Sequence, residues 1–420
     1  MSKVCVVGLG YIGLPTAAML ASCGHEVVGC DINERSVMLI NEGLAYFQEP
    51  DLQMLLTAAV QTGRLRAQSA PVEADYFILA VPTPFGAGKK PDMSYVHAAA
   101  DEIAPVLKRG NTVILESTSP VGATERLSER LAQSRPDLSF PNYQESGDYD
   151  VFMTHCPERI LPGNMVRELV SNDRIIGGMT EECATSALKL YDSFVTGRSF
   201  MTDCRTAEFV KLIENSYRDV NIAFANELSV ISEHLGVDVW RAIALANQHP
   251  RVSILQPGAG VGGHCIAVDP WFIIDAAPAL SRIIRTAREV NDAKPHWVTE
   301  RVLHLASRFR DPVVACFGIT YKPDVDDLRE SPSIEIVQLL AQQPGLRVLV
   351  VEPNIKNLPS ALASLPNVRL VDSDTARTEA DIVAFLVGHR QFRRLNTNLF
   401  LNKVVVDAIG LMSFIDRRYA

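Results

Sequence analysis

One short segment of this 420-residue chain combines a thiol, a carboxylate and a glycine-rich backbone. It reads PGAGVGGHCIAVD, with Cys265 directly after the glycine-rich run and Asp269 four residues later. Glycine adopts backbone conformations that other residues avoid, so this loop can approach a substrate closely. Cys265 is therefore a candidate nucleophile. A buried, unreactive thiol is the alternative, because cysteine is among the most buried residue types.

A second pattern, near the N-terminus, predicts a dinucleotide site. Gly8, Gly10 and Gly13 form a GLGYIG motif between a strand-like apolar run and a helical run. Such glycines let a pyrophosphate approach the N-terminus of the helix. Asp31 ends the next strand-like run, where a carboxylate accepts hydrogen bonds from ribose hydroxyls and repels a 2′-phosphate. The pattern predicts NAD rather than NADP, although the nearby Arg35 weakens this preference.

Three further motifs follow strand-like runs, so their polar groups are expected at the carboxyl edge of a sheet, where ligands bind. They are VPTP at Val81, ESTSPVG at Glu116 and CPER at Cys156. The hydroxyls of the first two could contact a cofactor, and the third supplies the carboxylate of Glu158. Simple turn chemistry is the alternative for the first two motifs, and an exposed ion pair is the alternative for the third.

A long helix is predicted for residues 206–235, where apolar positions recur with helical period and no proline intervenes. Its bulky apolar residues make it a candidate dimer surface. Lys211, Asn215 and Arg218 are spaced to share one face of this helix. Three adjacent polar groups there indicate a site. A solvated stripe with an ion pair between Glu208 and Lys211 is the alternative.

Around these residues, apolar runs alternate with helical runs in both halves of the chain, which is typical of doubly wound parallel sheets. The expected fold class is α/β, with two Rossmann-like doubly wound domains joined by a long central helix. We expect an NAD-binding domain at 1–200, a central helical and dimerisation region with the cysteine loop at 201–310, and a second Rossmann-like domain at 311–420. In that last domain Glu352 ends a strand as Asp31 does in the first.

The composition of the chain argues against several classes of binding partner. The net charge is −9 with basic residues scattered along the chain, which argues against a nucleic-acid or membrane partner. The eight cysteines include no CxxC pair, which argues against a disulfide framework or a zinc site. We therefore expect no metal and a reducing, cytoplasmic location.

Seven motifs together resemble those of the UDP-glucose and GDP-mannose dehydrogenase family, over essentially the whole chain. They are GLGYIG, VPTP, ESTSPVG, CPERILPG, ENSYRDVNIAFANE, GVGGHCIAVDP and YKPDVDDLRESP. The resemblance implies an NAD-dependent, four-electron oxidation of a UDP-sugar C6 alcohol to a carboxylate. Within the family, SYRDVN and HPRV most resemble members that act on UDP-N-acetyl-D-mannosamine. UDP-N-acetylglucosamine and UDP-glucose are the alternative substrates.

The resemblance also assigns roles to single residues. Cys265 would attack the bound aldehyde, and the thiohemiacetal would be oxidised to a thioester that water hydrolyses. Lys211 would act as general acid/base and, with Asn215, stabilise the oxyanion. The groups that would serve proton transfer to and from water are Asp269, Glu158 and Thr118. The cofactor-binding residues would be Gly8, Gly10, Tyr11, Ile12, Gly13, Asp31, Thr83, Thr124 and Arg329. The substrate-binding residues would be Arg159, Ile160, Lys211, Asn215, Arg218, His249, Arg251, Gly262, Tyr321 and Lys322.

The chain departs from the family pattern at one place. Close relatives carry a basic residue within a D-A-K-G run, whereas this chain has Ile409 there. A substrate contact is therefore missing, or it is supplied by Arg417 or Arg418. Two other kinds of protein are alternatives: a catalytically silent NAD-binding scaffold and a two-electron hydroxyacid dehydrogenase. The retained catalytic set argues against the first, and the cysteine loop argues against the second.

Overall fold

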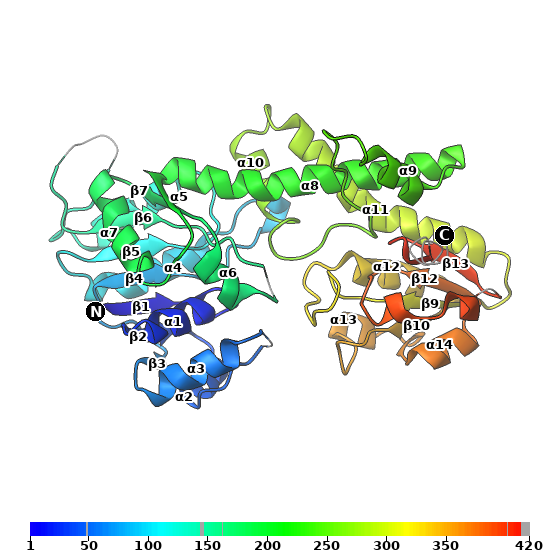
Figure 1. The fold of residues 1–420 in the computed structure, drawn as a ribbon, viewed down its shortest axis with the longest axis horizontal. Coiled ribbons are helices and arrows are strands. Elements are labelled where there is room, and N and C mark those ends of the chain that lie inside the picture. The colour runs from blue at the N-terminus through cyan, green and yellow to red at the C-terminus, as the bar shows by residue number, and fades with distance from the viewer. Residues whose placement is uncertain (48, 143–146, 162, 401, 413–420) are drawn as a thin grey trace. The chain divides into compact units, whose positions relative to one another are not determined.

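The computed structural model describes residues 1–47, 49–142, 147–161, 163–400 and 402–412 (Figure 1). By its internal contacts the chain divides into two compact units. The first unit comprises Met1–Glu214 and Trp271–Ala276, and the second comprises Asn215–Pro270 and Ala277–Ala420. The division falls inside the long helix α8 (Cys204–Leu235), which therefore supplies residues to both units.

Within the described residues of the first unit, eight strands form one sheet in the order β3-β2-β1-β4-β5-β6-β7-β8. The order of the first six is that of a dinucleotide-binding domain. The strands are β1 (Lys3–Val7), β2 (Glu26–Cys30), β3 (Leu65–Gln68), β4 (Tyr76–Leu79), β5 (Thr112–Leu115), β6 (Phe152–His155), β7 (Arg174–Gly178) and β8 (Ser199–Asp203). The helices are α1 (Gly13–Ser22), α2 (Glu34–Asn41), α3 (Leu52–Gln61), α4 (Ser94–Ile103), α5 (Ala123–Ser134), α6 (Met165–Ser171) and α7 (Glu181–Tyr191).

One pairing in this sheet corrects the expectation of a purely parallel arrangement. Strand β7 runs antiparallel to β6, with Thr154 opposite Gly178 and His155 opposite Gly177. Because β7 starts at the edge where β6 ends, the described residues of the connection, 156–161 and 163–173, stay at the carboxyl edge and do not cross the sheet. This segment carries the CPER motif. The reversed strand therefore places the CPER motif where ligands bind.

Within the described residues of the second unit, five parallel strands form a sheet in the order β11-β10-β9-β12-β13. They are β9 (Val313–Phe317), β10 (Arg347–Val351), β11 (Val368–Leu370), β12 (Ile382–Phe385) and β13 (Val404–Asp407). The helices of this unit are α9 (Val239–Ala246), α11 (Arg282–Ala306), α12 (Pro332–Ala341), α13 (Ser360–Ala363) and α14 (Ser373–Glu379), and α10 (Asp269–Ala276) begins in it. The expected fold class, two Rossmann-like α/β domains with a long central helix, is confirmed.

Each sheet has an apolar core on both of its faces. Successive side chains of a strand point to opposite faces, so Val4 and Val6 of β1 join one core while Cys5 and Val7 join the other. In the second unit, Val314 and Ala315 of β9 divide between two cores in the same way. Strands buried on both faces need continuous apolar runs, which is the pattern that the sequence shows.

Candidate active site

The N-terminal glycine motif forms a tight turn between β1 and α1. Gly8 has a φ of +90°, and its N–H donates to the Cys30 carbonyl at 2.8 Å. A Cβ on Gly13 would lie 1.8 Å from the Gly8 carbonyl oxygen, so only glycine lets the helix begin this close to the strand. In contrast, nothing lies within 4 Å of where a Cβ of Gly10 would be. This room beside a helix N-terminus fits the pyrophosphate of NAD.

Asp31 lies beside this turn at the end of β2. Its carboxylate accepts hydrogen bonds from the N–H groups of Leu9 at 2.9 Å and Asn33 at 2.8 Å. A carboxylate has about four lone-pair sites, so it can still accept from ribose hydroxyls. Tyr11 stacks its ring on Phe47 with 4.4 Å between the ring centroids, and Ile12 is the residue before α1. The glycines, Asp31, Tyr11 and Ile12 thus lie together around the turn between β1 and α1.

The hydroxyl motifs after β4 and β5 also meet at this edge of the sheet. The Thr83 hydroxyl donates to the Thr118 carbonyl at 2.7 Å, which ties one turn to the other. Thr124 lies in the first turn of α5, where its N–H and its hydroxyl both donate to the Glu208 carboxylate, at 2.8 and 2.7 Å. Glu208 also accepts from the Gly122 N–H at 2.5 Å.

These contacts exclude the alternative of an ion pair between Glu208 and Lys211. Glu208 is completely buried, and burial raises the pKa of its carboxyl. Its oxygens bind amides at the N-terminus of α5, where the helix dipole favours negative charge. Glu208 therefore anchors α8 to the turn that follows the ESTSPVG motif.

A buried arginine that the sequence analysis did not single out holds Glu158. Arg174, the first residue of β7, lies 3.1 Å from Glu158 and 3.6 Å from Glu116. Its guanidinium also lies over the Tyr191 ring, 4.3 Å from the centroid. The side chains of Arg174 and both glutamates are at most 7% exposed. Burial, and next the charge of Glu158, raise the pKa of Glu116 to about 8. The signal available in the sequence was a charged residue at the start of an otherwise apolar strand.

The segment after Glu158 is joined to α8. Arg159 forms an ion pair with Glu214 of α8 at 2.7 Å and donates to the Asp173 carbonyl at 2.9 Å. Ile160 packs against the core of the first unit. Lys211 is half-buried on α8, one turn before Asn215. The first unit thus holds Thr118, Glu158, Arg159 and Lys211.

The cysteine loop lies in the second unit together with two predicted partners. Cys265 is exposed, and none of the eight cysteines, all in the described part of the chain, forms a disulfide. The Cys265 carbonyl accepts from the Asp269 N–H at 2.8 Å as α10 begins. The Asn215 side chain donates to the Asp269 carboxylate at 2.5 Å, and both are buried. An exposed thiol is thus coupled through its own backbone to a buried amide–carboxylate pair.

We expected the glycines of this loop to let its backbone approach a substrate. In the structure they instead avoid clashes with neighbouring parts of the protein. A Cβ on Gly262 would lie 2.3 Å from the Glu330 carbonyl oxygen, and a Cβ on Gly263 would lie 2.7 Å from the Tyr321 ring. Gly260 has a φ of +145°, and a Cβ there would lie 2.7 Å from Pro332. The glycines therefore allow the cysteine loop to pack closely against the segment 321–332.

The other predicted binding residues also lie in the second unit. Arg218 is exposed on α8, and His249 and Arg251 are exposed after α9, with the Arg251 N–H donating to His249 Nδ1 at 3.3 Å. Arg329 forms an ion pair with Asp327 at 2.6 Å. Of the predicted catalytic residues, Asn215, Cys265 and Asp269 belong to this unit, whereas the others belong to the first.

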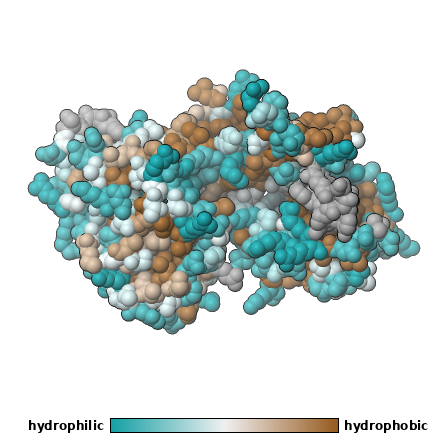
Figure 2. All heavy atoms as spheres, viewed as in Figure 1, coloured by the Kyte–Doolittle hydropathy of each residue, from teal (hydrophilic) through white to brown (hydrophobic). Residues whose placement is uncertain are grey.

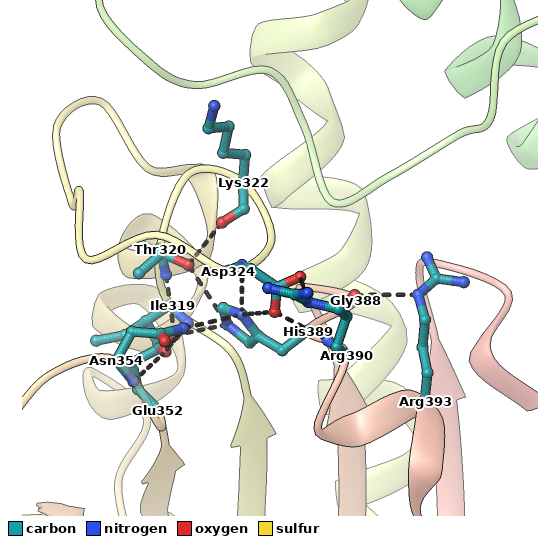
Figure 3. A network of polar contacts seen from close by, with 10 residues as sticks. All are labelled: Ile319, Thr320, Lys322, Asp324, Glu352, Asn354, Gly388, His389, Arg390 and Arg393. Carbon is teal, nitrogen blue, oxygen red and sulfur yellow. Dashed lines mark hydrogen bonds and ion pairs between the residues drawn. The ribbon is translucent and has the colours of Figure 1, made fainter. Parts of the chain in front are cut away.

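The structure also describes the surroundings of Ile409. A Cβ on Gly388 would lie 2.9 Å from the Arg393 guanidinium and 3.4 Å from the Ile409 side chain, so both flank the same glycine. Arg393 is exposed, and its Nε donates to the Gly388 carbonyl at 3.1 Å (Figure 3). Arg417 and Arg418, the replacements that the sequence analysis considered, lie outside the described residues.

A dinucleotide cradle, a second Rossmann-like sheet and an exposed thiol coupled to a carboxylate define an NAD-dependent dehydrogenase. Three family models match successive parts of the chain. The NAD binding domain of the UDP-glucose/GDP-mannose dehydrogenase family matches residues 2–195, its central domain matches 205–293, and its UDP binding domain matches 315–413.

Known proteins match over nearly the full length. The chain is 60% identical to an "NDP-N-acetyl-D-galactosaminuronic acid dehydrogenase" of Ralstonia nicotianae, over 98% of this chain and 96% of that one. It is 53% identical to a "UDP-N-acetyl-D-mannosamine dehydrogenase" of Escherichia coli K12, over 98% and 99%. A solved UDP-N-acetyl-D-mannosamine dehydrogenase from Pyrococcus horikoshii superimposes with a TM-score of 0.86 at 36% identity, covering 97% of this chain and 96% of that one.

This chain belongs to the UDP-glucose/GDP-mannose dehydrogenase family, which includes NAD-dependent UDP-sugar dehydrogenases. The expected cofactor, NAD, is confirmed by the match to the NAD binding domain. Among the described residues, no helix is long and apolar enough to cross a membrane. The same part of the chain shows no cluster of three or more histidine, cysteine or acidic side chains that could hold a metal ion.

Proposed function

We propose that this chain oxidises the C6 alcohol of UDP-N-acetyl-D-mannosamine to the carboxylate of UDP-N-acetyl-D-mannosaminuronate, through a covalent intermediate on Cys265. The observation that carries the proposal is the exposed Cys265, joined through its backbone to the buried Asn215–Asp269 pair. The relatives named for N-acetylmannosamine from Escherichia coli and Pyrococcus horikoshii support this choice of sugar.

NAD, when bound, supplies the hydride acceptor for both oxidation steps. Gly8, Gly10 and Gly13 would hold its pyrophosphate at the N-terminus of α1, and Asp31 would accept hydrogen bonds from the adenosine ribose. In the second unit, Tyr321 and Lys322 lead the segment that would bind the nucleotide sugar. Arg159, Arg218, His249 and Arg251 would complete the contacts to its diphosphate and sugar.

The thiolate of Cys265 adds to the aldehyde carbon that the first oxidation produces, which forms a thiohemiacetal. Loss of a hydride and a proton from this adduct gives a thioester. Water then adds to the thioester carbon, the carbon–sulfur bond breaks, and the carboxylate and the thiol are released. The Asn215 amide and the Lys211 ammonium would stabilise the oxyanion, because both are donors on one face of α8. Asp269 and Glu158, supported by Thr118, would move protons to and from the water.

A second candidate substrate has its own support. The relative from Ralstonia nicotianae, at 60% identity, is named for N-acetyl-D-galactosaminuronic acid. UDP-N-acetyl-D-galactosamine is therefore a competing substrate, beside UDP-N-acetylglucosamine and UDP-glucose. All except UDP-glucose carry an acetamido group. A site that hydrogen-bonds this group leaves buried polar atoms unpaired when it is absent, at a cost of about 1–3 kcal/mol for each unsatisfied partner.

The test supplies the purified protein with NAD and each of these four UDP-sugars, and follows NADH by absorbance and products by mass spectrometry. We expect two NADH per sugar, an acid product, and kcat/KM for UDP-glucose at least about tenfold below that for UDP-N-acetylmannosamine. One NADH per sugar with free aldehyde as product would refute the thioester route. NAD binding without turnover of any sugar would favour the silent scaffold, and preferred turnover of UDP-N-acetylgalactosamine would favour the second candidate.

A further inference from the structure

A buried polar network lies where three neighbouring strands of the second unit end. Strands β10, β9 and β12 are adjacent in the sheet, and their carboxyl ends carry Glu352, Thr320 and His389 (Figure 3). The side chains of Glu352 and His389 are both completely buried. Most buried polar groups in proteins are hydrogen-bonded, so the partners of each atom indicate what the network does.

Glu352 holds the turn after β9 instead of facing a ligand. Its Oε2 accepts from the Ile319 N–H at 2.8 Å and from His389 Nε2 at 3.0 Å, and its Oε1 accepts from the Asn354 N–H at 3.0 Å. Asp31 makes the matching contact to Leu9 in the first unit, but it is only half-buried. The carboxylate that would bind a ribose in a dinucleotide domain is therefore used here to hold a histidine.

The hydrogen bonds of His389 assign its protonation. The Asp324 N–H, at 2.9 Å, and the Asn354 side-chain amide, at 3.1 Å, both approach Nδ1. A backbone N–H can only donate, so Nδ1 is an acceptor and carries no proton. Nε2 then carries the proton and donates it to Glu352. His389 is thus a neutral bridge from a buried carboxylate to the backbone of residue 324.

The segment that His389 holds, residues 320–324, also has hydrogen bonds and a packing contact of its own. The Thr320 hydroxyl donates to the Lys322 carbonyl at 2.9 Å, and the Asp324 carboxylate accepts from Arg390 Nε at 2.9 Å. Asp324 has a φ of +61°, a conformation that is uncommon for residues other than glycine. The ring of Tyr321 fills the space beside Gly263 of the cysteine loop. Figure 3 shows the Lys322 side chain directed away from the network.

We propose that His389, in its Nε2-protonated form, is a positioning residue that sets the segment Thr320–Asp324 for nucleotide-sugar binding, with Glu352 fixing the tautomer. The chain of contacts runs from Glu352 to His389, from His389 to the Asp324 N–H, and from this segment to Tyr321 and Lys322. This inference rests on the proposed function, since Tyr321 and Lys322 are the proposed substrate contacts.

Two substitutions test separately the hydrogen bond of His389 to the Asp324 N–H and its hydrogen bond to Glu352. In His389→Asn the side-chain oxygen can occupy the place of Nδ1 and accept from the Asp324 N–H, while the bond to Glu352 is lost. In His389→Gln the side-chain amide can reach the place of Nε2 and donate to Glu352, but no acceptor remains for the Asp324 N–H. We expect His389→Gln to raise KM for the UDP-sugar by about three- to tenfold, the effect of losing one hydrogen bond. kcat and the KM for NAD should change by less than about twofold, and His389→Asn should keep a KM near that of the unmodified protein.

Amide hydrogen exchange in the full chain without ligands gives a second measurement. Peptides covering residues 320–326 should exchange faster in His389→Gln than in His389→Asn, whether or not the protein turns over a sugar, so failure of the proposed function would be seen separately. Equal effects of the two substitutions on KM and on exchange would overturn the proposal. If His389→Gln does not fold, Arg390→Ala removes the exposed anchor of the same segment, and an unchanged KM for the UDP-sugar in that variant would refute it.

Discussion

At the scale of single residues, accessibility distinguishes Cys265. Six of the eight cysteines are buried, and only Cys23 and Cys265 are exposed. Cys265 alone of these two lies next to a buried carboxylate, through the Asp269 N–H. Exposure gives a substrate access to the thiol, and the proposed function assigns proton transfer to the neighbouring Asp269. Access of this kind is the first requirement of a nucleophilic thiol.

Replacing Cys265 with serine should lower acid formation by orders of magnitude, because a serine alkoxide is not accessible near neutral pH without a strong base. NAD should still bind, since its cradle lies in the other unit. Steady-state rates of acid formation and calorimetric titration with NAD measure the two effects. Cys23→Ser is the matched control and should behave like the unmodified protein. Near-normal acid formation by Cys265→Ser would mean that another group is the nucleophile.

Ile409 carries a prediction that depends on its neighbour. The guanidinium of Arg393 and the side chain of Ile409 both lie close to the Cβ position of Gly388, so a cation is already present near position 409. Ile409→Lys should therefore change the Kd for UDP by less than about threefold, whereas Arg393→Ala should weaken UDP binding by about tenfold, as expected for a hydrogen bond to a charged group. Calorimetric titration with UDP compares the variants. Much tighter binding by Ile409→Lys would show that the missing basic residue had not been replaced.

At the scale of elements, the ends of β5, β6 and β7 enclose two carboxyls around one guanidinium. Arg174 neutralises only one negative charge, and Glu158 lies closer to it than Glu116 does. The hydroxyl of Tyr191 lies 3.3 Å from Glu116. A protonated Glu116 therefore relieves the repulsion, which agrees with its raised pKa of about 8.

This arrangement predicts how stability depends on pH. Glu116 ionises near pH 4.5 in the unfolded chain but near pH 8 in the folded one, so the folded chain holds an extra proton between these values. Its contribution to the free energy of unfolding is fully present below pH 4.5 and is lost as the pH rises through 8. Urea unfolding at pH 5.5, 7 and 8.5 should show this decline, and Glu116→Gln should flatten it. The exposed Glu129→Gln is the control, and an unchanged slope in Glu116→Gln would contradict the assignment.

At the scale of the whole molecule, one face of α8 is apolar and exposed. The exposed residues are Phe209, Ile213, Tyr217, Phe224, Ile231 and Leu235, each between 44% and 66% exposed. Their spacings of four and seven residues place them on one stripe of the helix. At 1.5 Å per residue, this helix of 32 residues is about 48 Å long. Hydrophobic residues also gather at the surface over the end of α8 and over α9 (Figure 2).

A stripe of this kind is typical of a subunit interface, and a two-fold axis would bury it against its own copy. We therefore predict a homodimer that is disrupted by Tyr217→Glu combined with Phe224→Glu. Light scattering coupled to size-exclusion chromatography measures the mass of each form. Met54→Glu, at an exposed apolar residue on α3, is the control for added charge alone. A monomeric unmodified protein at micromolar concentration, or a dimeric double variant, would contradict the prediction.

Much of the fold and many of the site motifs could be predicted from the sequence alone. Strand β1 ends directly before Gly8, Asp31 directly follows β2, and the glycine turn lies where the motif places it. These features depend on residues that are near neighbours in the chain. Strand β3, strand β8 and strand β11 were not predicted, because LRAQ, SFMTD and VRL are short and only partly apolar.

The tertiary structure decided what depends on distant residues. Local pattern gives a strand no direction, so only the folded sheet shows that β7 runs against β6 and keeps the CPER motif at the carboxyl edge. The partners of Glu208 and Arg174 lie between 16 and 86 residues away in the sequence. The glycines of the cysteine loop are required by Glu330, Tyr321 and Pro332. The bonds of His389 to Glu352 and Asp324 are of the same kind. A sequence specifies the chemistry of each group, but which charge is neutralised and which backbone needs room follows from contacts that form only on folding.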